Sequence, residues 1–212
     1  MSRRADERGM TLIEVMLGVA ILGIIIVPIG AALMLGFMTS SGTRELITDS
    51  SSVQLLASYA STDIQSAKWV IGVPSPAPGV PCSGSGAPLL RLEWEDPATA
   101  EDTIVVYEQR STASEGPSLH RVRCDGSGQV RDESRLVRSL STEPSGPPGF
   151  AVTCTRDDGS TGCPTAREGD VAAPVRKVTL DVRIDNPAAR DSAYEAREFR
   201  IEATRRVTTV AV

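Results

Sequence analysis

The sequence contains few of the residues on which catalysis, metal binding and nucleic-acid binding depend. His120 is the only histidine, no two cysteines are spaced as Cys-x-x-Cys, and the formal net charge is -5. A structural zinc site needs closely spaced ligands, a nucleophilic site needs a base, and nucleic-acid-binding domains are usually basic. We therefore expect no enzymatic activity, no cofactor, no metal and no nucleic-acid partner, with His120 lying on the face of a sheet.

Charge is also absent from one long stretch, because no charged side chain occurs between Val15 and Thr43. About 20 apolar residues suffice for a helix that spans a bilayer. Arg3, Arg4 and Arg8 precede this stretch, so we expect the N-terminus to lie in the cytoplasm and the rest of the chain outside. The alternatives are an ordinary uncleaved anchor and a cleaved signal peptide, whose apolar region would be only about 7 to 15 residues long.

Glu14 lies just inside this apolar stretch, and neither an anchor nor a signal peptide requires it. A charged side chain near the interface can reach the headgroups at little cost. Ionisable groups within membrane segments are also candidates for a function that involves a charged partner. The residues around Glu14 favour the second interpretation.

The segment Arg8-Gly9-Met10-Thr11-Leu12-Ile13-Glu14-Val15 resembles the prepilin N-terminal motif of type IV pilins and type II secretion pseudopilins. The resemblance implies that a membrane prepilin peptidase removes residues 1–9, cutting between Gly9 and Met10, and methylates the amine of Met10. Glu14 is then the fifth mature residue, as in the family. Met10 departs from the phenylalanine that usually comes first.

The resemblance also implies how the mature protein assembles. Residues 10–38 are a transmembrane helix that contacts lipid before assembly and becomes a filament core afterwards, with an inner-membrane assembly platform and other pilins or pseudopilins as partners. Pairing of Glu14 with the amine of a neighbouring subunit neutralises two charges that would be costly in an apolar bundle. Pro28 removes one helical hydrogen bond and is expected to kink or interrupt the helix.

Residues 39–72 are expected to continue as an amphipathic helix that ends near Ile71 and Gly72. Its apolar residues recur at helical spacing: Leu46, Val53, Leu56, Ala60, Ile64, Ala67 and Val70. The segment 61–67 is similar to one of J-type pseudopilins and PilW-like minor pilins. Asp63 within it either caps a sheet edge or lies on a solvated face.

Residues 73–212 are expected to form a β-rich head. Apolar and polar residues alternate there with a period of two, around residues 90–94, 104–106, 120–124, 136–140, 178–184 and 199–207, which is typical of half-buried antiparallel strands. Residues 141–173 are the least regular stretch. A helix packed on such a sheet is an α+β fold, which is also the fold that the resemblance implies. A run of arginines from Arg121 to Arg138 is interpreted as a solvated face.

The head contains four cysteines: Cys82, Cys124, Cys154 and Cys163. An even number in an exported domain predicts disulfides. Closing the short loop between Cys154 and Cys163 would stabilise the fold by about 2–3 kcal/mol, so we favour this pair together with Cys82–Cys124. Sequence alone leaves all three pairings open.

The sequence therefore predicts a minor pilin or pseudopilin, a structural subunit of a type IV pilus or a type II secretion-like filament. The resemblance implies a position at the tip, where such subunits initiate assembly. Three alternatives remain: a major pilin, a DNA-capturing competence pilin, and a single-pass anchored domain that binds a ligand outside the cell.

Overall fold

The structure is a computed structural model, which describes residues 12–72, 82, 84–96, 99–113, 116–142, 148–185 and 196–206, without the side chains of 37–46 and 168–169. The chain divides into two compact units, Met1–Ile47 and Thr48–Val212. Helix α1, Leu12–Ser66, begins in the first unit and ends in the second. Each unit is described by itself below.

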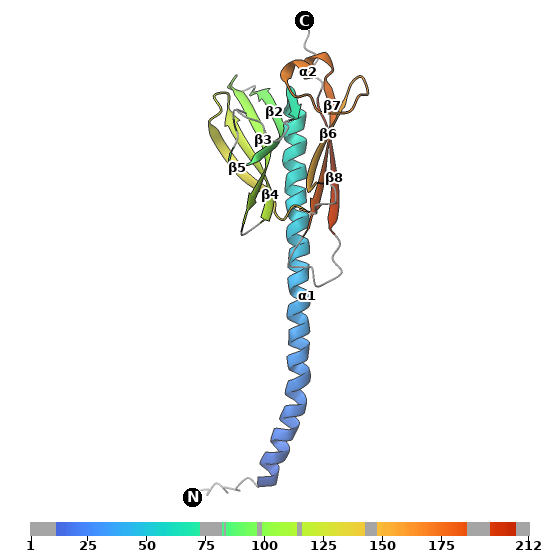
Figure 1. Cartoon of the computed structure of the whole chain (residues 1–212). Coiled ribbons are helices and arrows are strands. Elements are labelled where there is room, and N and C mark those ends of the chain that lie inside the picture. The colour runs from blue at the N-terminus through green and yellow to red at the C-terminus, as the bar shows by residue number, and fades with distance from the viewer. Residues whose placement is uncertain are drawn as a thin grey trace, which may run out of the picture. The chain divides into compact units, whose positions relative to one another are not determined.

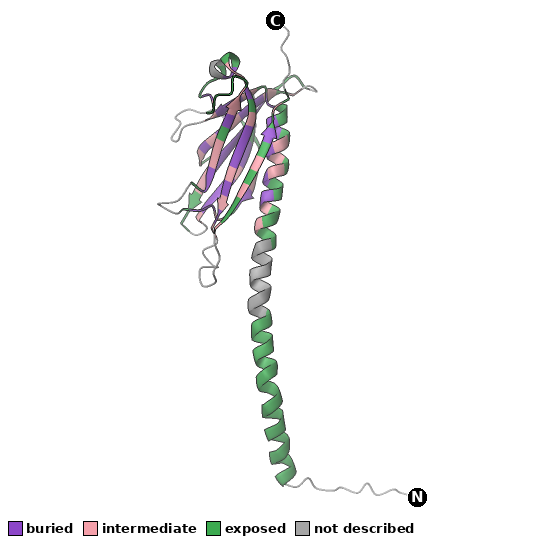
Figure 2. Ribbon diagram, turned by 90° about the vertical axis from the view of Figure 1, so that its right-hand side faces the viewer, coloured by how far each residue is buried: buried purple, intermediate pink, exposed green. Residues whose placement is uncertain are grey.

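In the first unit, α1 is apolar enough to cross a membrane. The stretch Leu12–Gly36 has a mean hydropathy of 2.7 and is long enough to span a bilayer, by length and composition. Its side chains are all exposed, as Figure 2 shows in green. The interruption expected near Pro28 is absent, because α1 continues through this residue without a break.

The second unit contains the end of α1, two antiparallel sheets and a short helix (Figure 1). The five-stranded sheet has the order β1-β2-β3-β4-β5, with strands Trp69–Gly72, Ala87–Glu95, Asp102–Thr112, Gly116–Asp125 and Val130–Val137. The three-stranded sheet has the order β6-β7-β8, with strands Phe150–Arg156, Val175–Ile184 and Arg197–Thr204. Helix α2, Arg167–Ala172, precedes β7.

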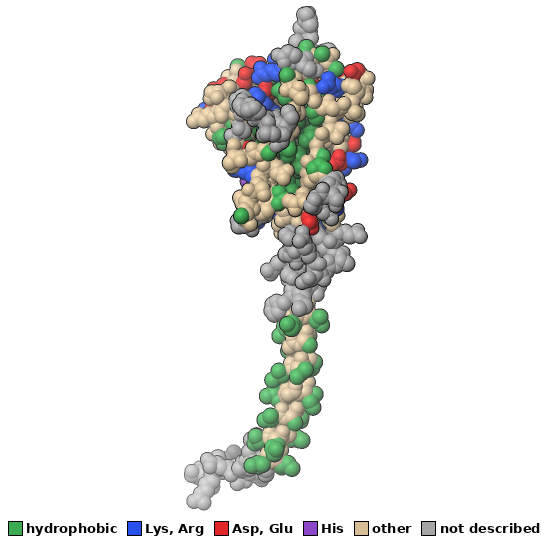
Figure 3. Space-filling view, in the orientation of Figure 1, with side chains coloured by type: hydrophobic (Ala, Val, Ile, Leu, Met, Phe, Trp, Pro, Cys, Tyr) green, Lys and Arg blue, Asp and Glu red, His purple; other side chains and the backbone are tan. Residues whose placement is uncertain are grey.

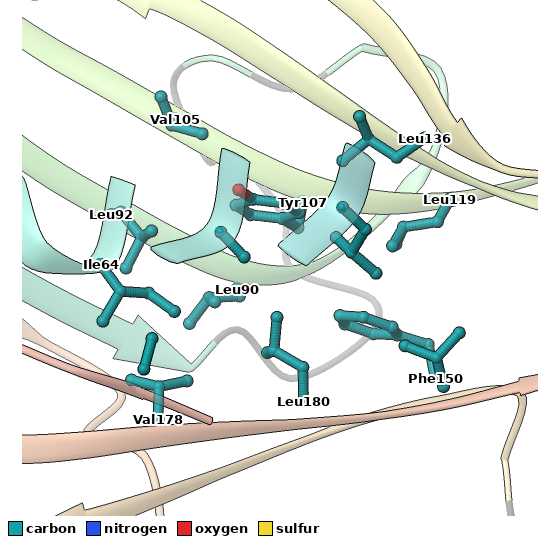
Figure 4. Packing of buried hydrophobic residues seen from close by; sticks show 14 of the residues in the cluster. Ile64, Leu90, Leu92, Val105, Tyr107, Leu119, Leu136, Phe150, Val178 and Leu180 are labelled. Atoms are coloured by element: carbon teal, nitrogen blue, oxygen red, sulfur yellow. The ribbon is translucent and has the colours of Figure 1, made fainter. Parts of the chain in front are cut away.

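The main hydrophobic core lies between α1 and both sheets. Apolar residues at helical spacing on α1, including Leu56, Ala60 and Ile64, are fully buried against residues of each sheet. Figure 4 shows Leu90 of β2 and Leu180 of β7 converging with Ile64. The apolar face that the sequence predicts on this helix is therefore what joins the two sheets.

A second, smaller core lies on the opposite face of the five-stranded sheet, where the disulfide between Cys82 and Cys124 covers part of β3 and β4. It consists of five residues: Cys82, Ile104, Val106, Val122 and Cys124. Their spacing in β3 and β4 places them on the face that α1 does not contact, because side chains alternate along a strand. The other disulfide joins Cys154 to Cys163. Both bridges have the pairing that the sequence analysis favoured.

Several boundaries differ from those expected. Helix α1 ends at Ser66 rather than near Gly72, and residues 69–72 form β1 instead. The stretch 141–173 contains β6 and α2, and the strand expected at 136–140 is β5, which begins at Val130. The strands form two sheets rather than one. The α+β class is confirmed, whereas the side chain of Leu46 and the position of Val207 lie outside the described residues.

Candidate functional site

The N-terminal motif can be followed in the structure only from residue 12 onwards. Gly9 and Met10 lie outside the described residues, whereas Glu14 lies in the first turn of α1 with an exposed side chain. The first turn carries the positive end of the helix macrodipole, which stabilises a carboxylate. Glu14 therefore lies at the end of the helix where the macrodipole favours a negative charge.

The surface beyond Glu14 is apolar on every side of the helix. Figure 3 shows hydrophobic side chains along this part of α1, and large ones such as Met16, Ile24 and Val27 are about two-thirds exposed or more, at 67%, 74% and 72%. An apolar surface this continuous requires lipid or other protein around it. Its chemistry suits a membrane before assembly and a bundle of like helices afterwards.

Asp63 forms a buried ion pair between α1 and the five-stranded sheet. Its carboxylate accepts two hydrogen bonds from Arg121 of β4, from Nε at 2.7 Å and from Nη2 at 2.9 Å. The hydroxyl of Tyr107 on β3 donates a third, at 2.7 Å. The guanidinium carbon of Arg121 also lies 4.8 Å from the centre of the Tyr59 ring. Both expectations for Asp63 were wrong, as was the solvated position expected for Arg121, because both side chains are buried.

The electrostatics of this cluster, Asp63–Arg121–Tyr107, favour the charged pair and the neutral phenol. Burial, followed by the charge of Asp63, raises the pKa of Tyr107 well above its ordinary value. Burial alone would lower the pKa of Arg121, but the hydrogen bonds and charge of Asp63 outweigh this, and the pKa is raised. The cluster therefore fixes the rotation and height of α1 against the sheet.

The raised pKa of Tyr107 predicts a loss of stability at alkaline pH. The unfolded chain releases the phenol proton near pH 10 while the folded chain retains it, so stability falls as pH rises above about 10, by about 1.4 kcal/mol per unit. Urea titrations between pH 9 and 11 should show this slope in the wild type and a shallower one in Tyr107→Phe. Equal slopes would contradict the assignment.

Asp170 of α2 joins the two sheets where β1 and β7 begin. One carboxylate oxygen accepts the backbone N–H of Val70 at 3.2 Å and Nη1 of Arg205 at 2.7 Å. The other accepts the N–H of Val175 at 2.8 Å. Asp170 is fully buried, so its charge is satisfied by three donors from three separate segments.

The disulfide Cys154–Cys163 holds the segment before α2 against this junction. The N–H of Gly72 donates to the carbonyl of Pro164 at 2.8 Å. A side chain at position 72 would collide with the Cβ of Cys163, so glycine permits this close approach. Sequence reasoning missed the junction because neither β1 nor α2 has a recognisable pattern.

Replacing Asp170 by alanine is expected to lower the free energy of unfolding by about 2–4 kcal/mol, because it leaves buried donors without acceptors. Urea denaturation measures the change. Asp158→Ala is the matched control, since Asp158 is exposed and accepts hydrogen bonds from the backbone N–H and the hydroxyl of nearby Ser160. A loss from Asp170→Ala no larger than that from the control would show that the junction contributes little.

A further group of charges lies on the outer face of the five-stranded sheet. Arg110 Nε donates to Glu108 at 2.6 Å and Nη1 to Glu133 at 2.5 Å. His120 lies on the same face, as expected, and burial followed by the charge of Arg110 lowers its pKa. The residues that the structure describes include no group of acidic, histidine or cysteine side chains able to hold a metal ion.

The architecture is a long apolar N-terminal helix that continues into a helix packed on antiparallel sheets, an α+β fold consistent with a type IV pilin. Residues 4–30 match the model of the prokaryotic N-terminal methylation motif. This match supports the type IV pilin and pseudopilin family, and it implies processing by a prepilin peptidase and assembly with other pilins. No curated protein and no solved structure matches the chain.

Proposed function

We propose that the chain is a minor pilin or pseudopilin that is cleaved between Gly9 and Met10, methylated on Met10 and assembled through α1. The observation that carries the proposal is the methylation motif at residues 4–30, which runs directly into the exposed apolar stretch Leu12–Gly36. The protein is a structural subunit and a substrate of the peptidase. Before cleavage it crosses the cytoplasmic membrane once, with residues 1–9 inside and residues 73–212 outside.

Cleavage creates a cationic group that can pair with Glu14 of another subunit. The new amine of Met10 is cationic, and Glu14 of one subunit pairs with the amine of its neighbour as the helices leave the lipid for an extracellular or periplasmic filament. Pairing offsets the desolvation of both charges and sets the axial register between subunits. Pro28 leaves a helical carbonyl without its usual donor, so the helix bends there when neighbours pack against it.

The minor role, with a position at the tip, is supported by the second unit. Both sheets pack on α1 through one hydrophobic core, and the cluster of Asp63, Arg121 and Tyr107 joins this helix to the five-stranded sheet. Residues 61–67 are the segment similar to J-type and PilW-like proteins. The competence alternative loses support because Arg121, the first residue of its basic run, is buried against Asp63.

Mass spectrometry of the N-terminus tests the proposal. The mature protein, purified from membranes, should begin with a methylated Met10. An N-terminus at Met1 would instead favour a single-pass anchored binding domain, and one after Ala32 would favour an ordinary signal peptide. Immunoblots of sheared filaments distinguish a major from a minor subunit by abundance.

A further inference from the structure

The open edges of β-sheets are places where another strand can add, and proteins usually protect them. The edge of β1 is covered, since the N–H of Gly72 donates to Pro164. The edge of β6 is covered in the same way, since the carbonyl of Cys154 accepts the N–H of Gly162. Strand β5 pairs with β4 through two register shifts and carries exposed charges. Irregularity and charge protect that edge.

Strand β8 carries exposed charges as β5 does, but among the described residues it has neither a covering segment nor a register shift. It pairs with β7 over eight residues without a register shift, from Arg197 to Thr204. The N–H of Arg205 donates to the carbonyl of Arg176, the residue opposite it in this register. Because hydrogen bonding alternates along an antiparallel pair, the backbone groups of Glu198, Arg200 and Glu202 point away from β7. They form a regular row of donors and acceptors that no described segment bonds.

The side chains along this edge alternate in character. Phe199 and Ile201 pack against the main core but remain half-buried. Glu198, Arg200 and Glu202 lie on the other face with side-chain exposures of 70%, 68% and 50%. An added strand would extend the apolar row of Phe199 and Ile201 with its own apolar residues. On the other face, it would place opposite charges beside Glu198, Arg200 and Glu202.

A cavity of about 470 Å³ extends across the three strands of this sheet and reaches β8. Glu198, Phe199 and Arg200 of β8 line it, together with residues of β6 and β7. In strand addition, backbone hydrogen bonds supply affinity, while hollows beside the edge receive alternate side chains and supply specificity. The regular row of backbone groups and the incomplete apolar row therefore coincide on β8, and the cavity that crosses the sheet also reaches this strand.

We propose that the outer edge of β8 is a docking site for an extended segment of a different filament subunit. The segment pairs with β8 through its backbone, places apolar side chains beside Phe199 and Ile201, and carries an acidic residue opposite Arg200 and a basic one opposite Glu202. The identity of the partner as a filament subunit rests on the proposed function, whereas the docking chemistry does not.

A second copy of this chain fits less well. Antiparallel pairing of two β8 strands requires a twofold axis perpendicular to them. Because the strands of this sheet run alongside the end of α1 (Figure 1), residues 48–66 of the two copies would then point in opposite directions, unlike subunits of one filament. Parallel pairing about an axis along the strands would place the two apolar rows on opposite faces, where neither covers the other.

A free peptide carries no helix that fixes its direction, so it can pair with β8 in the antiparallel orientation and serve as a probe of the edge. A labelled synthetic peptide of residues 197–204, Arg-Glu-Phe-Arg-Ile-Glu-Ala-Thr, can dock antiparallel with its Glu202 opposite Arg200, its Arg200 opposite Glu202, and Ile201 opposite Ile201. Fluorescence anisotropy with the detergent-solubilised full chain should show saturable binding. The peptide with Arg200→Glu and Glu202→Arg should bind at least about ten-fold more weakly, because it places like charges opposite each other.

Two sets of protein variants separate backbone from side-chain effects. Glu198→Pro removes an outward N–H without touching the bonds to β7 and should weaken peptide binding at least about ten-fold, whereas Glu198→Ala keeps the N–H and should bind within about two-fold of wild type. The doubly changed chain, Arg200→Glu with Glu202→Arg, should restore binding of the charge-reversed peptide. If Glu198→Pro fails to fold, the charge-reversed chain and the charge-reversed peptide still test the proposal.

Equal binding by Glu198→Pro and Glu198→Ala, both folded, would overturn the proposal, as would equal binding of the two peptides. Spontaneous disulfide-linked dimers of the Ile201→Cys variant in membranes would show that a second copy of this chain, rather than a different subunit, occupies the edge of β8. If the chain binds the peptide but its N-terminus remains at Met1, the docking surface on β8 is supported and the assignment of its partner as a filament subunit is rejected. The docking proposal and the proposed function can therefore fail separately.

Discussion

Replacing Asp63 by alanine is expected to lower the free energy of unfolding by about 3–5 kcal/mol, the usual cost of removing one partner of a buried ion pair. The loss arises because Arg121 and the hydroxyl of Tyr107 remain buried without the carboxylate that they both bond. Urea denaturation monitored by tryptophan fluorescence measures the change directly.

Two controls test this explanation. Asp181→Ala breaks a pair of the same 2.7 Å length with Arg200, at side-chain exposures of 39% and 68%, and should cost less than about 1 kcal/mol because water screens it. The combined change Asp63→Leu, Arg121→Met and Tyr107→Phe replaces all the polar groups together and should restore most of the stability. A triple variant as unstable as Asp63→Ala would show that packing, rather than an uncompensated charge, causes the loss.

The second large effect is expected at Glu14. Glu14→Ala should be cleaved and methylated normally, yet its incorporation into filaments should fall at least about ten-fold, because the amine of Met10 on the neighbouring subunit loses the charge that offsets its desolvation. The ratio of filament-bound to membrane-bound protein, measured by immunoblot, gives the effect.

Glu14→Gln is the informative companion, because it preserves shape and removes only the charge. Like Glu14→Ala, it should be incorporated poorly into filaments, while mass spectrometry should find the normally cleaved and methylated N-terminus at Met10. Normal incorporation of either variant, or loss of cleavage in both, would reject the pairing role for Glu14.

Periodicity in the sequence predicted the elements whose environment is uniform along their length. The apolar stripe of α1 that includes Leu56, Ala60 and Ile64 is buried as expected, and β7 alternates as its sequence indicates. The segment after Ser66 was assigned to the helix because Ala67 and Val70 fit both a helical stripe and the start of a strand. Tertiary pairing with β2 decided between them.

Contacts between distant residues could not be predicted in this way. Asp63 bonds Arg121, which lies 58 residues further along the chain, and no local pattern connects them. Asp170 likewise bonds Val70 across 100 residues. Strand β6 was missed because it is short and is followed by a turn-rich segment, so only the register with β7 identifies it.

Strand β3 has a consequence for how the molecule opens. It is the central strand of its sheet, and six successive residues, Thr103 to Glu108, are buried, because α1 covers one face and the smaller core the other. Local fluctuations open strands that have a free edge or a solvent-exposed face far more easily than a central strand buried on both faces. The amides of these six residues should therefore exchange hydrogen only when the whole unit unfolds, so that β3 reports the global stability. The amides of Glu198, Arg200 and Glu202, which point away from β7 at the open edge, should exchange far faster.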